Sequence, residues 1–178
     1  MQVRITTELL YKAALVFALM DAVCVPLLVW RVRVESFRRL KWPLAISAAL
    51  VWWGIWSWAI GNYWETFYRY VFPAWLHTWI PWTALVIAGT VSAGLWALSL
   101  RLKWNSVLVF LLMGGSLGCI THAWAVYLGI VARPPMLQGA SPLAVVTIAF
   151  FEFMVYWCVI LTLAKTLDWA RGKLARDG

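Results

Sequence analysis

The stretch PLAVVTIAFFEFMVYWCVILTLA, residues 142–164, decides the fold class of this chain. It is apolar along its whole length apart from Glu152 near the middle. A helix of about 23 residues is about 34 Å long, which is enough to cross the hydrocarbon core of a bilayer. A carboxylate at the centre of such a helix costs several kcal/mol unless it has a partner. We therefore expect a transmembrane helix whose glutamate faces other protein groups.

The composition of the whole chain is that of a membrane protein. Of its 178 residues, 64% are hydrophobic and 12% are charged, whereas soluble domains average roughly 45–50% apolar and about 25% charged residues. Membrane spans and short connections use nearly all of this length, so no soluble domain of ordinary size is expected. The sequence predicts a single all-α transmembrane domain over residues 1–178.

Four further apolar runs complete a predicted bundle of five transmembrane helices. The segment ETFYRYVFPAWLHTWIP, residues 65–81, mixes aromatic residues with prolines, which favours a connection lying along the membrane interface. Gly114 and Gly118 have the GxxxG spacing that permits close helix packing, so we expect the fourth span to pack tightly against a neighbour beside His122. The predicted spans are about 13–30, 43–64, 82–100, 106–132 and 142–164.

The positive charge of the chain is arranged as a topology signal. Three segments, residues 31–42, 101–103 and 165–178, hold eleven of the 15 Lys and Arg residues. By the positive-inside rule these segments are cytoplasmic, which places the amino terminus outside and the carboxyl terminus inside, in what we expect to be the plasma membrane. Although the net charge is +8, its distribution does not form a groove-lining basic patch, so we expect no nucleic-acid partner.

Three groups that can ionise or bind protons lie deep inside apolar spans: Asp21, His122 and Glu152. With the predicted orientation, all three lie roughly 12–15 Å below the outer boundary of their spans. Such groups usually face a cavity or one another. Aromatic residues at neighbouring positions could form the wall of that cavity; they are Trp52, Trp56, Trp124, Tyr127 and Tyr156.

Three functions compete for this set of residues. The first is binding of an apolar ligand with one polar or cationic end, such as a lipid, isoprenoid, quinone or tetrapyrrole. The second is an accessory or structural subunit of a larger membrane complex or homo-oligomer. The third is a proton or metal site, or an intramembrane enzyme acting on a lipid-like substrate. We disfavour the third, because the inner halves of the spans are almost wholly apolar and no closely spaced ligands or nucleophile–base pair occur.

The architecture, five spans in a short chain with 15 tryptophans, resembles that of the tryptophan-rich sensory (translocator) proteins, which bind porphyrins and sterols. The segment LHTWIPW, residues 76–82, has isolated prolines and not the paired-proline and tryptophan motif of that family. The resemblance therefore assigns no residue and no cofactor. We expect a non-catalytic protein, surrounded by membrane lipids, that binds an apolar small molecule without a metal.

Overall fold

The computed structural model describes residues 5–70, 72–102, 104–127 and 139–177, with the side chains of 124–127 and 176–177 left out of the description. Over these ranges the chain is all-helical and contains no strand. Five of the helices are long and apolar enough to cross a membrane. The predicted fold class, an all-α bundle of five membrane-spanning helices, is therefore confirmed.

The five long helices correspond one to one with the predicted spans. The first begins at Thr7, before the predicted residue 13, because the side chain of Thr6 caps it by accepting a hydrogen bond from the backbone N–H of Leu9 at 3.2 Å. Residues 128–132, the end of the predicted fourth span, lie outside the described residues. The helices are α1 (Thr7–Arg31), α3 (Lys41–Tyr63), α4 (Ile80–Arg101), α5 (Ser106–Tyr127) and α6 (Pro142–Asp177).

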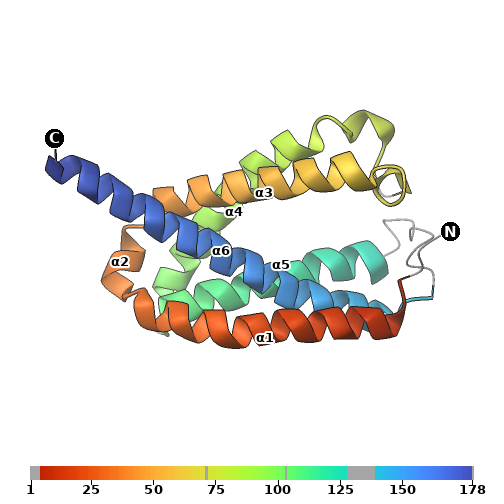
Figure 1. The fold of residues 1–178 in the computed structure, drawn as a ribbon, viewed down its shortest axis with the longest axis horizontal. Coiled ribbons are helices and arrows are strands. Elements are labelled where there is room, and N and C mark those ends of the chain that lie inside the picture. The colour runs from red at the N-terminus through yellow and green to blue at the C-terminus, as the bar shows by residue number, and fades with distance from the viewer. Residues whose placement is uncertain (1–4, 71, 103, 128–138, 178) are drawn as a thin grey trace.

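The last helix, α6, continues well beyond the stretch that predicted it. Its 36 residues make a helix of about 54 Å, much longer than the roughly 30 Å of a bilayer core. The span predicted from the sequence ends at about residue 164. In the structure the tail extends α6, and its carboxyl-terminal end projects past the other helices (Figure 1).

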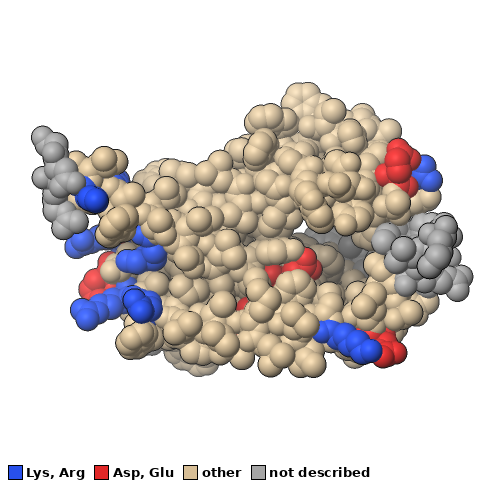
Figure 2. Space-filling model, in the orientation of Figure 1, with Lys and Arg blue, Asp and Glu red and all other residues tan. Residues whose placement is uncertain are grey.

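Short helices occupy the connections at the two ends of the bundle. The basic connection after α1 contains α2 (Val34–Arg38), and the aromatic connection between α3 and α4 contains the 3-10 turns η1 (Tyr68–Tyr70) and η2 (Ala74–Leu76). Most Lys and Arg side chains gather at the α2 end of the molecule (Figure 2). The helices thus place the basic segments at one end of the bundle, as the topology signal requires.

Helix α6 is the central element, because it packs against α5, α1 and α3, while α3 and α4 form a close pair. The main core lies toward the α2 end, where Phe37 and Phe110 meet with ring centroids 5.6 Å apart and Trp157 covers Phe110. Helix α1 fully buries only Leu10, Ala14 and Asp21; Cys24, Val25, Leu28 and Val29 pack against the main core while partly exposed, and many of its other apolar side chains are exposed. That exposed surface suits contact with lipid tails.

Candidate functional site

The surface of the bundle is hollowed between α3 and α6, on the side nearer the η1–η2 connection, and acidic atoms face the hollow (Figure 2). Glu152 lies on α6 and is half-buried. Around it the structure gathers side chains from α3, from the η1 turn and from α6 itself. We call this region the Glu152 site.

One oxygen of the Glu152 carboxylate has a hydrogen-bond partner among the described residues and the other does not. Oε1 accepts a hydrogen bond from the hydroxyl of Tyr156, which lies one turn further along the same face of α6. Oε2 has no hydrogen-bond or ion-pair partner within the described part of the chain, and it is not sealed from the surface. A group entering the site would therefore meet a carboxylate oxygen that still needs a donor or a cation.

The first aromatic wall of the site is built by Trp52, which is only 9% exposed. Its ring centroid lies 5.3 Å from that of Tyr156 and 4.9 Å from that of Phe153, the residue after Glu152. The contact with Tyr156 is edge-to-face and that with Phe153 is tilted, and such ring contacts between α3 and α6 favour one relative rotation of the two helices as well as adding to burial. Trp52 therefore holds the face of α6 that carries Glu152 toward α3.

The second wall comes from the connection between α3 and α4. Trp56, one turn after Trp52, packs against Tyr68 of η1 at 5.5 Å and against Phe72 at 6.2 Å between ring centroids. Burial raises the pKa of Tyr68 to about 12, and the nearby negative charges of Glu152 and Tyr63 add to that rise. The connection thus folds inward, and Tyr68 lies close enough to Glu152 for the carboxylate charge to raise the pKa of its phenol.

His122 joins the site through an aromatic contact. Its ring centroid lies 5.6 Å from that of Phe153, and its Nδ1 lies 3.0 Å from the carbonyl oxygen of Gly118. With the proton on Nδ1 donated to that carbonyl, Nε2 keeps its lone pair and can accept a hydrogen bond. Within the described chain no hydrogen bond or ion pair joins His122 to Glu152.

The predicted close packing at the GxxxG positions is confirmed, and the neighbour is α6. A Cβ atom placed on Gly118 would lie 2.5 Å from the carbonyl oxygen of Ala149 and 2.6 Å from Cγ of Phe153. Only a glycine allows α5 to approach α6 this closely. Because His122 follows one turn after Gly118, this approach is what brings the imidazole against Phe153.

Asp21 lies apart from the Glu152 site. Its side chain is buried, 3% exposed, which confirms that it faces protein. Asp21 lies near Cys158 of α6, the helix against which α1 packs. Neither carboxylate oxygen has a hydrogen-bond partner among the described residues. The three groups expected at one depth are therefore divided: Glu152 and His122 share neighbours, and Asp21 faces a different side of α6.

Two predicted site residues, Trp124 and Tyr127, have side chains outside those the structure describes, so their assignment stays a prediction. Sequence reasoning missed Tyr68, Phe72 and Phe153. The four-residue spacing of Tyr68 and Phe72 in the aromatic connection was the one local signal for them. Across the described ranges no three His, Cys, Asp or Glu side chains gather closely enough to hold a metal ion.

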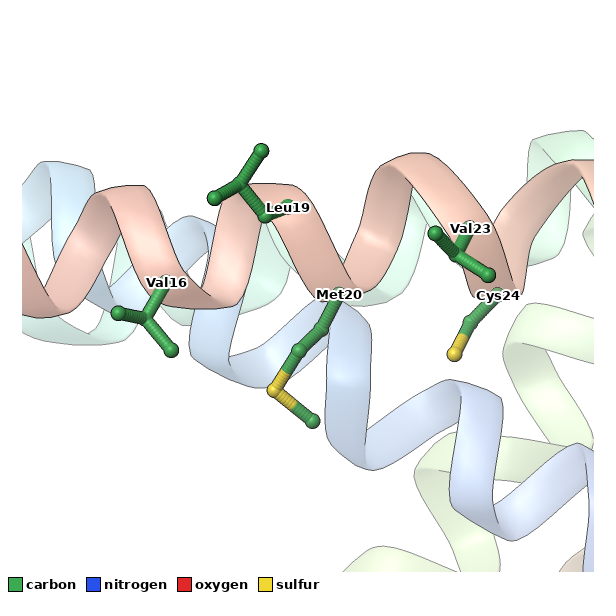
Figure 3. Close-up of a pocket in the computed structure, with 5 residues that line it drawn as sticks. All are labelled: Val16, Leu19, Met20, Val23 and Cys24. Atoms are coloured by element: carbon green, nitrogen blue, oxygen red, sulfur yellow. The ribbon is translucent and has the colours of Figure 1, made fainter.

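A separate, open hollow of about 440 Å³ lies along α1. All of its lining side chains belong to that helix, and those of Met20 and Cys24 extend toward α6 (Figure 3). It contains no charged group, so it offers an apolar surface without a means of orienting a polar end. Its lining residues are Val16, Leu19, Met20, Val23 and Cys24.

No protein-family model, no curated protein and no solved structure matches this chain.

Proposed function

We propose that this protein binds an apolar small molecule with one polar or cationic end in the hollow between α3 and α6. The observation that carries the proposal is the Glu152 carboxylate beside the rings of Trp52 and Tyr68: Tyr156 binds one oxygen, and the other has no partner among the described residues. A carboxylate within an apolar bundle has a strong need for a donor or cation. A ligand that supplies one gains affinity by satisfying this need.

The geometry favours a cationic or hydroxyl-bearing end over an anionic one. Aromatic faces attract cations, and a carboxylate beside them adds a full negative charge, whereas an anionic end would be repelled by Glu152. With the Nδ1 proton donated to Gly118, the Nε2 atom of His122, whose ring contacts Phe153, can accept a second hydrogen bond from a ligand hydroxyl. Among lipids, isoprenoids, quinones and tetrapyrroles, this arrangement favours amine-bearing and hydroxyl-bearing members.

The test is to purify the protein in mild detergent and to identify what it retains by absorption spectroscopy and mass spectrometry of the extract. Glu152→Gln and Trp52→Leu should each reduce the retained small molecule roughly tenfold, because each removes an interaction worth about 1–2 kcal/mol. Trp58→Leu is the matched control, since Trp58 lies on the same helix but is 60% exposed. It should leave retention unchanged.

Two outcomes would contradict the proposal. Equal retention in wild type and both site variants would show that the Glu152 site does not bind the molecule. Stoichiometric co-purification of other polypeptides with no retained small molecule would instead support the accessory-subunit alternative.

We further propose that the α2 end of the bundle is cytoplasmic and that the protein lies in the plasma membrane, because the Lys and Arg residues gather at that end. Two exposed positions at opposite ends test the orientation, in a background without Cys24, Cys119 and Cys158. Thr66→Cys should react with an impermeant thiol reagent in intact cells, and Glu35→Cys only after permeabilisation. The reverse pattern would overturn the orientation.

A further inference from the structure

A groove of about 450 Å³, distinct from the hollow along α1 described above, lies between the carboxyl-terminal end of α1 and α6, close to the α2 end of the bundle. Its polar part is formed by Arg31, Lys165 and the threonines Thr162 and Thr166, with Trp169 beside them. This groove is separate from the Glu152 site, which lies about three turns back along α6.

The two cations in this groove lack an acidic partner in the part of the chain that the structure describes. Within the described chain, neither Arg31 nor Lys165 forms an ion pair, and the guanidinium of Arg31 lies over the ring of Trp30 at 5.2 Å. The nearest acid along α6, Asp168, is paired with Arg171 at 3.3 Å. Two positive charges therefore flank the groove and attract an anion.

The threonine hydroxyls do not compete with the cations as donors. Thr162 donates to the carbonyl oxygen of Cys158 at 2.8 Å, and Thr166 donates to that of Thr162 at 3.0 Å. Both hydroxyl protons are therefore used inside α6. An anion in the groove would be bound by the guanidinium of Arg31 and the ammonium of Lys165.

The groove has an apolar part beside its cationic part, as a binding site for a phospholipid does. Leu28 and Val32 line it next to Arg31, which is the last residue of α1. Lys165 is the first charged residue after the apolar run of α6. Cations at the end of a membrane span lie at the level of the headgroup phosphates, and the apolar residues one turn deeper lie beside acyl chains.

We propose that this groove binds an anionic phospholipid of the leaflet on the basic side of the membrane. The headgroup phosphate lies between Arg31 and Lys165, and an acyl chain lies along Leu28. Charge complementarity selects this occupant: a zwitterionic lipid brings its own cation to a doubly positive groove, and a free phosphate makes no use of the apolar wall.

The test compares lipids on the full-length protein in detergent. Phosphatidylglycerol should raise the thermal unfolding temperature more than phosphatidylcholine does, and native mass spectrometry should show it retained. The double variant Arg31→Gln with Lys165→Gln should bind it on the order of tenfold more weakly, since each basic residue near a membrane surface contributes a several-fold gain. The control, Arg38→Gln with Arg39→Gln, removes the same charge from exposed positions at the same end and should retain the lipid.

Three results would overturn the proposal. An equal loss in the control variant would show a diffuse charge effect and not a site. Equal stabilisation by phosphatidylcholine would show that the phosphate is not selected by charge. Stabilisation by inorganic phosphate alone, to the same extent as by phosphatidylglycerol, would show that the groove takes a free anion.

Discussion

The hydroxyl of Tyr156 donates a hydrogen bond to the carboxylate of Glu152, one turn earlier on α6. Within the described chain, no hydrogen bond or ion pair joins Glu152 to His122, the other polar group expected at this depth. The hydrogen bond from Tyr156 explains how a carboxylate can stand in the middle of a membrane-spanning helix. One oxygen is satisfied within the helix, and the other has no hydrogen-bond or ion-pair partner among the residues that the structure describes.

The first prediction is that Glu152 and Tyr156 are energetically coupled. Glu152→Leu and Tyr156→Phe should each lower the thermal stability in detergent. The loss of stability in the double variant should be smaller than the sum of the two single losses by about 0.5–1.5 kcal/mol. This is the magnitude of hydrogen bonds between side chains of membrane helices. The same cycle with Glu152 and His122 is the control and should be close to additive. Strict additivity for Glu152 with Tyr156 would show that their hydrogen bond contributes nothing to stability.

The second prediction concerns the close approach of α5 to α6. Gly118→Ala should destabilise the protein by about 1–3 kcal/mol, because the added methyl group collides with Ala149 and Phe153. Gly54→Ala, in α3, is the matched control: no atom lies within 4 Å of its added Cβ, and alanine favours the helix over glycine. Thermal unfolding should show a loss for the first variant and no loss for the second. Equal stability of both variants would contradict the tight packing at Gly118.

The third prediction is that Asp21 weakens the fold. Both of its carboxylate oxygens are buried without a hydrogen-bond partner among the described residues, and such a group costs about 1–3 kcal/mol. Asp21→Leu should therefore leave the thermal stability unchanged or raise it, whereas Glu152→Leu should lower it. A large loss of stability in Asp21→Leu would mean that the carboxyl has a partner in the folded protein.

The fourth prediction is a loss of stability at alkaline pH through Tyr68. Because the pKa of this phenol is raised to about 12 from an unfolded value of about 10, the unfolded chain loses the proton first as the pH rises. The stability is fully present below pH 10 and is lost between pH 10 and 12. Tyr68→Phe should reduce this loss. Thermal unfolding from pH 9 to 11.5 tests it, with Tyr11→Phe, an exposed tyrosine of α1, as the control. Identical pH profiles for Tyr68→Phe and wild type would contradict the prediction.

The five spans could be predicted from the sequence because crossing a bilayer is a local requirement. A helix must be long enough and apolar enough by itself, whatever surrounds it. For the same reason the run 142–164 was identifiable as a span although it contains Glu152. The continuation of α6 through Asp177 was missed, since a polar helix outside the membrane carries no hydropathy signal.

The candidate site was predicted only in part. Trp52 contacts Tyr156, which binds Glu152, while Trp56 joins the site through Tyr68 and His122 through Phe153. Asp21 is not part of this group. Counting residues along a helix gives depth at about 1.5 Å per residue, so the depths of Asp21 and Glu152 could be compared. The direction in which each side chain points around its helix depends on packing, which no single segment contains.

What the sequence determined by itself was therefore the helices, their polarity pattern and the close approach at Gly118, because these follow from local length, hydropathy and the absence of a side chain. What only the tertiary structure decided was the rotation of α6. Trp52 turns Glu152 and Tyr156 toward α3, and the contact of α6 with α1 buries Asp21 on another side. A helix that is apolar on all sides has no polar face to fix its rotation, so packing against its neighbours sets that rotation.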